Sequence, residues 1–167
     1  MMKINVFTEN IHSSISVDEK KAITVAKKIL KNYLKQDFYE KSTLFGHEYS
    51  TISFDFVFCD NEKTHEVNKE YRKKDYVADI ITFAIFADSE EKFVFDGEIN
   101  LGEIFISLDK VQENSEKNNT NFEKELNFLI SHGIMHLLGF DHQTEEDYNF
   151  VINAQKSALL EIEEKVK

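Results

Sequence analysis

The sequence predicts an α+β protein in which a small β-sheet is covered by helices. Four segments carry the alternation or the continuous apolar character of strands, and five carry apolar residues at helical spacing. These segments are mixed along the chain, without the strict strand–helix–strand repeats of a doubly wound sheet. With 167 residues, of which 41% are hydrophobic, the chain can bury a core of its own, so residues 1–167 are expected to form a single domain.

The chain is expected to begin with a strand and a helix. Lys3–Phe7 alternates weakly and predicts an edge strand. Ser16 and Glu19 have the spacing of a capping box, in which the hydroxyl accepts hydrogen bonds from first-turn amides. Apolar residues at helical period then predict a helix, namely Ala22, Ile23, Ala26, Ile29, Leu30, Tyr33 and Leu34.

Two strands and a helix are expected in the middle of the chain. Thr51–Cys59 alternates and predicts a strand with Ile52, Phe54, Phe56 and Phe58 on one face. Residues 60–74 are polar with a short helical stripe, and Asp60 or Asn61 is expected to cap this helix. Ile80–Phe86 is apolar and rich in β-forming residues, which predicts a central strand.

The next three segments follow without a break in composition. Asp88–Gly97 is charged and is expected to be a loop. Glu98–Ser107 has the apolar residues of another strand, and Leu108–Ser115 predicts a short helix.

Two longer helices complete the predicted fold. Thr120 and Glu123 form a second capping box, and a helix is expected from Phe122 to Leu137, where Gly139 suits a left-handed stop. Thr144–Lys165 predicts a last amphipathic helix. Its expected inner face consists of Tyr148, Val151, Ile152, Ala158, Leu159 and Ile162.

Composition excludes several classes of protein. A net charge of −11 argues against a protein that coats nucleic acid without specificity. The single cysteine, Cys59, cannot form an internal disulfide, which suits a reducing compartment. Neither a signal peptide nor an apolar run of membrane-spanning length is evident. We therefore expect a cytoplasmic protein without a membrane partner.

Three of the six histidines fall in one segment, His132-Gly-Ile-Met-His136-Leu-Leu-Gly139-Phe-Asp141-His142. His132 and His136 are four residues apart on a predicted helix, so both imidazoles leave one face and can reach one ion. Gly139 ends the helix, which lets the chain turn back and present His142 from another direction. Three histidine ligands with an open position describe a catalytic zinc-type site for one divalent ion.

The metal site is favoured over a chance arrangement. Two histidines at this spacing can arise by chance in a sequence with six, but a third directly after a helix-ending glycine is much rarer. His12, His47 and His65 have no such arrangement and are interpreted as structural or surface residues.

The histidine spacing also matches that of the metzincin peptidases. Those enzymes carry a glutamate directly after the first histidine as the general base, whereas this chain has Gly133. A zinc metallopeptidase is therefore retained only as an alternative in which a remote carboxylate, such as Glu103, is the base.

Asp141, which precedes His142, admits three interpretations. Its carboxylate could support a ligand histidine as a second-shell group, act as a base beside the metal, or help to close the helix end. The supporting role and the turn role are favoured over the base.

The complete segment His132–His142 resembles the YbeY family of metal-dependent endoribonucleases, whose hallmark is His-Gly-x-x-His-Leu-x-Gly-aromatic-Asp-His. Three weaker blocks are similar to the family in the same order: Asn68-Lys-Glu-Tyr71-Arg72-Lys-Lys-Asp75, Ala78-Asp79-Ile80-Ile81-Thr82-Phe83 and Leu101-Gly102-Glu103-Ile104. The family's prolines are replaced by Val77 and Ala84, its threonine by Ala78, and its last-helix methionine by Val151. None of these departures removes a metal ligand.

The resemblance implies a small four-stranded, mostly mixed sheet packed with about five helices, with the zincin-like histidine helix behind it. The resemblance also implies that Arg72 faces the metal cleft, where a guanidinium can form bidentate hydrogen bonds with phosphate. Arg72, His132 and His136 are thus expected to act in catalysis. Lys73 and Lys74 are weaker candidates for RNA contacts, since cations also favour a helix C-terminus.

The resemblance further implies single-stranded ribosomal RNA as the substrate. The expected setting is maturation of the small-subunit RNA 3′ end and ribosome quality control, with the small ribosomal subunit and assembly factors as partners. Besides the peptidase, a non-catalytic ribosome-assembly factor with a structural metal stays open as an alternative.

Overall fold

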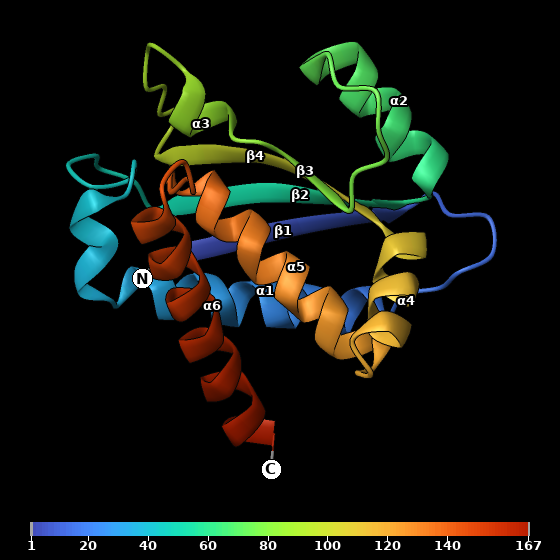
Figure 1. Ribbon diagram of the computed structural model, residues 1–167. Helices are drawn as coiled ribbons and strands as arrows, with labels where there is room; N and C mark the ends of the chain where they lie inside the picture. Colours follow the sequence, from blue (N-terminus) through green and yellow to red (C-terminus); the bar gives the residue numbers. More distant parts are fainter. Residues whose placement is uncertain (1, 167) are drawn as a thin grey trace.

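The computed structural model describes residues 2–166 and contains one four-stranded sheet. The strands are β1 (Lys3–Asn10), β2 (Thr51–Cys59), β3 (Ile80–Phe83) and β4 (Glu98–Ser107), in the spatial order β1-β2-β4-β3. β1, β2 and β4 are parallel, and β3 runs antiparallel to β4 (Figure 1). The sheet is therefore mixed, and the predicted α+β class is confirmed.

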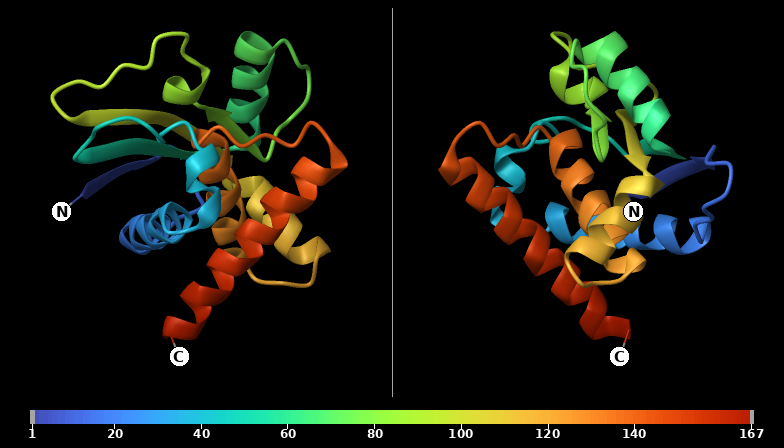
Figure 2. Two further views of the ribbon diagram at one scale, coloured as in Figure 1. Left: turned by 90° about the vertical axis from the view of Figure 1, so that its left-hand side faces the viewer. Right: turned by 45° about the vertical axis from the view of Figure 1, so that its right-hand side comes forward.

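Helices lie on both sides of this sheet. Four helices lie on one side of the sheet: α1 (Glu19–Leu34), α4 (Leu108–Lys117), α5 (Phe122–Leu137) and α6 (Glu145–Val166). The other side is covered by α2 (Asn61–Arg72) and the short α3 (Ile85–Asp88) (Figures 1 and 2). A 3₁₀-helix, η1 (Asp37–Lys41), follows α1. None of the helices within residues 2–166 is both long enough and apolar enough to cross a membrane.

The main core lies between the sheet and the helices α1 and α5. The four apolar residues expected on one face of β2 are at most 1% exposed, and they belong to one cluster with Ile29 of α1 and Ile130 and Ile134 of α5. The alternation of β2 therefore predicted its buried face correctly. A smaller cluster of Val67, Ala78 and Ile81 lies where α2 covers β3 on the opposite side.

The predicted central strand Ile80–Phe86 is wrong in two respects. Only Ile80–Phe83 is extended, this strand lies at an edge of the sheet, and the chain enters α3 at Ile85. The apolar run misled the prediction because this edge strand has neighbours on both faces: Ile80 lies against α5, and Ile81 lies in the cluster with Val67 of α2. α3 and η1 are absent from the predicted elements.

The two predicted capping boxes are also wrong. Asp18 caps α1 by accepting a hydrogen bond from the Lys21 amide at 3.1 Å, and Asn121 caps α5 by accepting from the Lys124 amide at 2.9 Å. Asp18 and Asn121 lie closer to their helices than the predicted Ser16 and Thr120. Their short carboxylate and amide side chains can therefore reach the first-turn amides. Asp60 caps α2 as expected.

The inner face of α6 differs from its prediction at two positions. Tyr148 is 50% exposed, while Gln155, absent from the predicted face, is fully buried. Val151, Ala158 and Ile162 are buried as expected. The buried face of α6 therefore contains one amide among apolar side chains.

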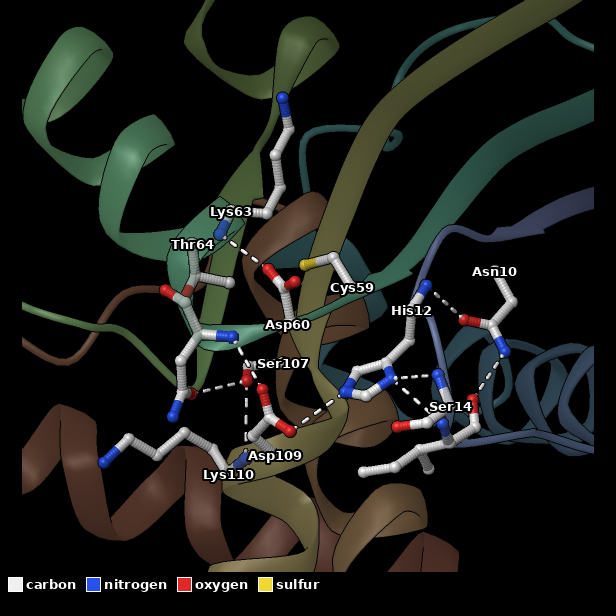
Figure 3. A network of polar contacts seen from close by, with 12 residues as sticks. Asn10, His12, Ser14, Cys59, Asp60, Lys63, Thr64, Ser107, Asp109 and Lys110 are labelled. Carbon is white, nitrogen blue, oxygen red and sulfur yellow. Dashed lines mark hydrogen bonds and ion pairs between the residues drawn. The ribbon is translucent and has the colours of Figure 1, made fainter.

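A network of polar contacts ties the loop after β1 to the starts of α2 and α4 (Figure 3). His12 lies 2.9 Å from a carboxylate oxygen of Asp109, and its Nδ1 accepts hydrogen bonds from the amides of Ser14 and Ile15. The other carboxylate oxygen of Asp109 accepts a hydrogen bond from the Asn61 amide at 2.9 Å. These contacts fix the first turn of the helix whose last residue is Arg72.

Gly102 allows β4 to approach the end of β3 closely. Its φ is +133°, and a Cβ there would lie 1.9 Å from the carbonyl oxygen of Phe83. We expect Gly102→Ala to lower the free energy of unfolding by at least about 2 kcal/mol, because backbone strain and overpacking act together. Gly46→Ala is the matched control, since Gly46 also has a positive φ, +87°, but would meet no atom within 4 Å.

Chemical denaturation of both variants measures this difference. The control is expected to lose only about 1 kcal/mol, the usual cost of a left-handed conformation. Equal losses in the two variants would mean that backbone conformation alone, and not the contact with Phe83, requires glycine.

Candidate metal centre

Helix α5 places two of the three site histidines side by side. The side chains of His132 and His136 project from the same face of α5, one turn apart. Their ring centroids are 4.6 Å apart, and their Nε2 atoms are 3.0 Å apart. Two nitrogens that ligate one tetrahedral ion at ~2.0–2.1 Å are roughly 3.3 Å apart. The two Nε2 atoms therefore lie close to the separation that one shared ion requires.

The end of α5 brings the third histidine to the pair. Gly139 has a φ of +94°, its amide donates to the carbonyl of His136, and the Phe140 amide donates to the carbonyl of Met135. This is a Schellman ending, which reverses the chain after the helix. The ring centroid of His142 consequently lies 5.4 Å from that of His132 and 5.1 Å from that of His136.

The three imidazoles each offer a nitrogen, and these nitrogens lie within 4.8 Å of one another. Among the side chains that the structure describes, those of residues 2–163, this is the only group of three or more histidine, cysteine or carboxylate side chains gathered in this way. The donor set suits a divalent ion that accepts imidazole ligands, and it leaves a coordination position for a further ligand. These residues therefore fit a metal ion.

Burial prepares two of the histidines for this role. Burial in the protein lowers the pKa of His132, and burial together with the neighbouring His132 and His142 lowers the pKa of His136 to about 4. Both imidazoles are consequently neutral near pH 7, so that lone pairs are available to an ion without the loss of a proton.

Asp141 holds the segment that carries His142. One of its carboxylate oxygens accepts a hydrogen bond from the His142 amide at 2.7 Å, and the other accepts from the Gln143 side chain at 3.0 Å. The bond from the His142 amide is the main cause of the lowered pKa of Asp141. The hydrogen bonds of both oxygens thus lie within the turn, and none of them goes to an imidazole ring.

The histidines line a cavity of about 710 Å³ that also receives the only arginine of the chain, Arg72. β3 is an edge strand, so Arg72 from α2 and the histidines from α5 meet at this edge although their helices lie on opposite sides of the sheet. The charge of Arg72 contributes to the lowered pKa of His136. The guanidinium and the imidazoles therefore share one electrostatic environment.

Lys73 and Lys74 do not line this cavity. Lys73 adopts a left-handed conformation that ends α2, and its ammonium group donates to the carbonyl of Glu70 at 3.3 Å. The Lys74 amide donates to the carbonyl of Asn68, and both lysine side chains are exposed. The end of α2 thus directs Arg72 to the cavity and leaves its two basic neighbours outside.

Several residues of the site were not predicted from the sequence. Asp79, Thr82, Asp88 and Gln143 line the cavity, and Gln155 contacts His132 from α6. Thr82 lies in a predicted strand and Asp79 directly before it, both within a segment that resembles a family strand, and neither prediction gave these two residues a role in the site. The position of Gln155 could have been recognised from the sequence, because it lies at helical spacing between Val151 and Ala158, on the core-facing side of α6.

The remaining histidines lie elsewhere. His12 binds Asp109, His65 lies 2.6 Å from Asp75, and His47 packs edge-on against Phe86. None of the three joins the cluster of His132, His136 and His142.

The comparison with protein families decides the relationship. The family model described as "Endoribonuclease YbeY" matches residues 7–163. This chain belongs to the YbeY family. The YbeY hallmark spans the same residues that form the histidine cluster, so the family signature and the metal-competent geometry coincide.

Relatives named "Endoribonuclease YbeY" support this assignment. One from Malacoplasma penetrans is 39% identical over 108 residues, which is 65% of this chain and 69% of the relative. Another from Bacillus pumilus is 46% identical over 103 residues, or 59% of this chain and 65% of the relative. The solution structure of TM1509 from Thermotoga maritima has a TM-score of 0.56 with 21% identity, covers 97% of this chain and 93% of its own, and indicates a shared fold.

The lowered pKa of His136 predicts how the stability of the metal-free protein changes with pH. An unfolded chain protonates its histidines near pH 6.5, whereas folded His136 has a pKa of about 4. The unfolded state therefore binds more protons between these values, and the free energy of unfolding falls as the pH drops from about 6.5 to 4. Denaturant titrations at several pH values measure this decline.

His136→Gln is the control for that measurement, because glutamine has similar polarity but no proton to gain. We expect its unfolding free energy to fall less steeply over the same pH window. An identical pH dependence in both proteins would exclude His136 as the source.

Proposed function

We propose that this chain is a zinc-dependent endoribonuclease that cleaves single-stranded ribosomal RNA. The observation that carries the proposal is one cavity wall on which three imidazole nitrogens lie within 4.8 Å of one another, with the guanidinium of Arg72 lining the same cavity. A metal-competent cluster beside a phosphate-binding cation suits phosphodiester cleavage. Membership of the YbeY family, whose description names an endoribonuclease, supports the same reaction class.

His132, His136 and His142 would hold one divalent ion. Zinc suits them because it is commonly bound by neutral imidazoles in sites with three protein ligands. When bound, it would supply Lewis acidity, which polarises a phosphoryl oxygen and lowers the pKa of water. The neutral state of the buried histidines makes them ready ligands at pH 7.

Arg72 is the residue that we expect to bind the scissile phosphate. Its guanidinium offers a planar fork of N–H donors that matches two phosphate oxygens, and it stays charged at any physiological pH. The negative charge on these oxygens grows as the phosphodiester is cleaved, so a fixed cation there stabilises the transition state more than the bound substrate.

The electrostatics of the cavity favour a single strand. Three carboxylates, Asp79, Asp88 and Asp141, line the cavity beside a single arginine, and the whole chain carries a net charge of −11. A duplex would present a broad array of phosphates to this acidic surface. A cavity of about 710 Å³ has the size of a small-ligand site and accommodates a few unpaired nucleotides.

The proposed setting is the maturation of the small-subunit ribosomal RNA 3′ end and ribosome quality control in the cytoplasm. The small ribosomal subunit and its assembly factors would present the RNA. Support comes from the family, since the resemblance of the His132–His142 segment links the chain to ribosomal RNA maturation.

A metallopeptidase is disfavoured by the packing of Gly133. A Cβ at this position would lie 2.8 Å from Ile104 of β4 and 3.2 Å from Ile80 of β3, so the glutamate that a zincin peptidase carries here would have to displace these side chains. Glu103 cannot replace it, because it does not line the cavity. Its neighbour Ile104 faces α5, so Glu103 points to the other face of β4.

A purely structural metal is disfavoured by the donor set. A structural zinc is usually closed by four protein ligands, whereas the described residues offer three, and these open into a cavity.

Arg72→Ala tests the proposed role of the arginine. We expect cleavage of a labelled ribosomal RNA precursor with an unprocessed small-subunit 3′ end to slow about 10²- to 10³-fold, the usual loss for one preorganised donor. Zinc content, measured by atomic absorption, is expected to stay at one ion per chain. His136→Ala and chelator-treated protein are expected to lose both zinc and cleavage.

Lys74→Ala is the matched control, because it removes a neighbouring cation that does not line the cavity. Cleavage at the wild-type rate by zinc-loaded Arg72→Ala would remove the arginine from the reaction. A zinc-loaded wild type that binds small ribosomal subunits without cutting RNA would instead favour the assembly factor, and digestion of casein would favour the peptidase.

A further inference from the structure

Gln155 of α6 is fully buried and lies directly behind the metal-competent cluster. Its side-chain carbonyl oxygen lies 3.1 Å from Nδ1 of His132. Its amide nitrogen donates to the backbone carbonyl of Phe128 at 3.2 Å and to the hydroxyl of Ser131 at 3.0 Å. Every hydrogen-bonding atom of this buried amide is thus engaged with α5.

The orientation of the amide is determined by its partners. The carbonyl of Phe128 can only accept, and the Ser131 hydroxyl already donates to that carbonyl at 2.7 Å, so it turns a lone pair toward Gln155. Both groups require the NH₂ of the amide. A rotated amide would place its oxygen against the Phe128 carbonyl, which buries two acceptors against each other.

This orientation fixes the proton of His132. The oxygen of Gln155 can only accept, so Nδ1 of His132 must carry the proton, and Nε2 must carry the lone pair. Nε2 is the atom that lies 3.0 Å from Nε2 of His136. Among the described side chains, those of residues 2–163, neither His136 nor His142 has a comparable ring hydrogen bond to another kind of side chain or to the backbone.

We propose that Gln155 is a positioning residue that holds His132 in the tautomer and ring orientation required of a metal ligand. The inference rests on the proposed metal site, but it does not depend on RNA as the substrate. It assigns to α6 a role in metal affinity, because the amide reaches His132 from that helix. Outer partners of ligand histidines commonly contribute about 10- to 100-fold to metal affinity.

Gln155→Met tests the role, because methionine has a similar length and replaces the amide oxygen by a sulfur that is only a weak acceptor for the His132 N–H. Zn²⁺ affinity is measured by competition with a chromophoric chelator, in the absence of RNA. We expect a loss of about 10- to 100-fold. In the metal-free protein, nitrogen chemical shifts of the His132 ring are expected to report Nδ1 protonation in the wild type and a mixture of tautomers in the variant.

Gln155→Glu and Val151→Ala separate positioning from packing. The glutamate keeps an acceptor for His132 but loses both donors to α5, so we expect a lower melting temperature with Zn²⁺ affinity within about tenfold of the wild type. Val151 is buried on the same helix, and its truncation loosens α6 without removing the amide. We expect Val151→Ala to melt earlier and to keep its Zn²⁺ affinity.

The comparison of Zn²⁺ affinity with melting temperature across the three variants tests the proposal. Zn²⁺ affinity that follows the hydrogen bond, and not the melting temperature, supports a positioning role. Affinity that falls with melting temperature in all three variants, or an unchanged affinity in Gln155→Met, overturns it. If Gln155→Met does not fold, Ser131→Ala replaces it in the test. This variant removes one of the two acceptors that orient the Gln155 amide, so we expect it to weaken Zn²⁺ binding several-fold. Unchanged Zn²⁺ binding by Ser131→Ala overturns the proposal as well.

Discussion

The close approach of α5 to the sheet is the constraint on which the site depends. Gly133 lies against Ile104 of β4 and Ile80 of β3 so tightly that even a methyl group would have to displace a side chain. On its other sides α5 packs against α1, α4 and α6, and the Tyr33 hydroxyl of α1 donates to the carbonyl of Ser131. A helix held by the sheet and by three other helices is restrained from rotating, so the face that carries His132 and His136 is fixed relative to the edge strand β3.

The position of β3 at the edge of the sheet gives the site its second component. A histidine helix and an arginine helix on opposite sides of a sheet can meet only where the sheet ends. The polar network of His12 and Asp109 fixes the start of α2, and the left-handed Lys73 ends it, so that Arg72 alone among its basic neighbours reaches the cavity. The acidic chain thereby concentrates one guanidinium where anionic substrate is expected to bind.

Local patterns predicted the elements better than their ends or their neighbours. The alternation of β2 and the helical period of α1 and α5 reflect burial on one face, which a short window of sequence records. The caps were misplaced because several short polar side chains precede each helix and only the backbone path decides which of them reaches the first turn. The apolar run at Ile80 could not reveal an edge strand, since burial by α2 and α5 has the same signature as burial within a sheet.

By itself the sequence determined that His132, His136 and His142 gather at one helix end, because a helical spacing of four and a glycine with positive φ two residues after the helix are local geometry. Only the tertiary structure decided what surrounds them. Arg72 lies 60 residues before His132 and Gln155 lies 23 residues after it, and no local rule relates such distant positions. Their contacts follow from the order of strands in the sheet and from the packing of α6 on α5, which arise only when the chain buries its apolar faces together.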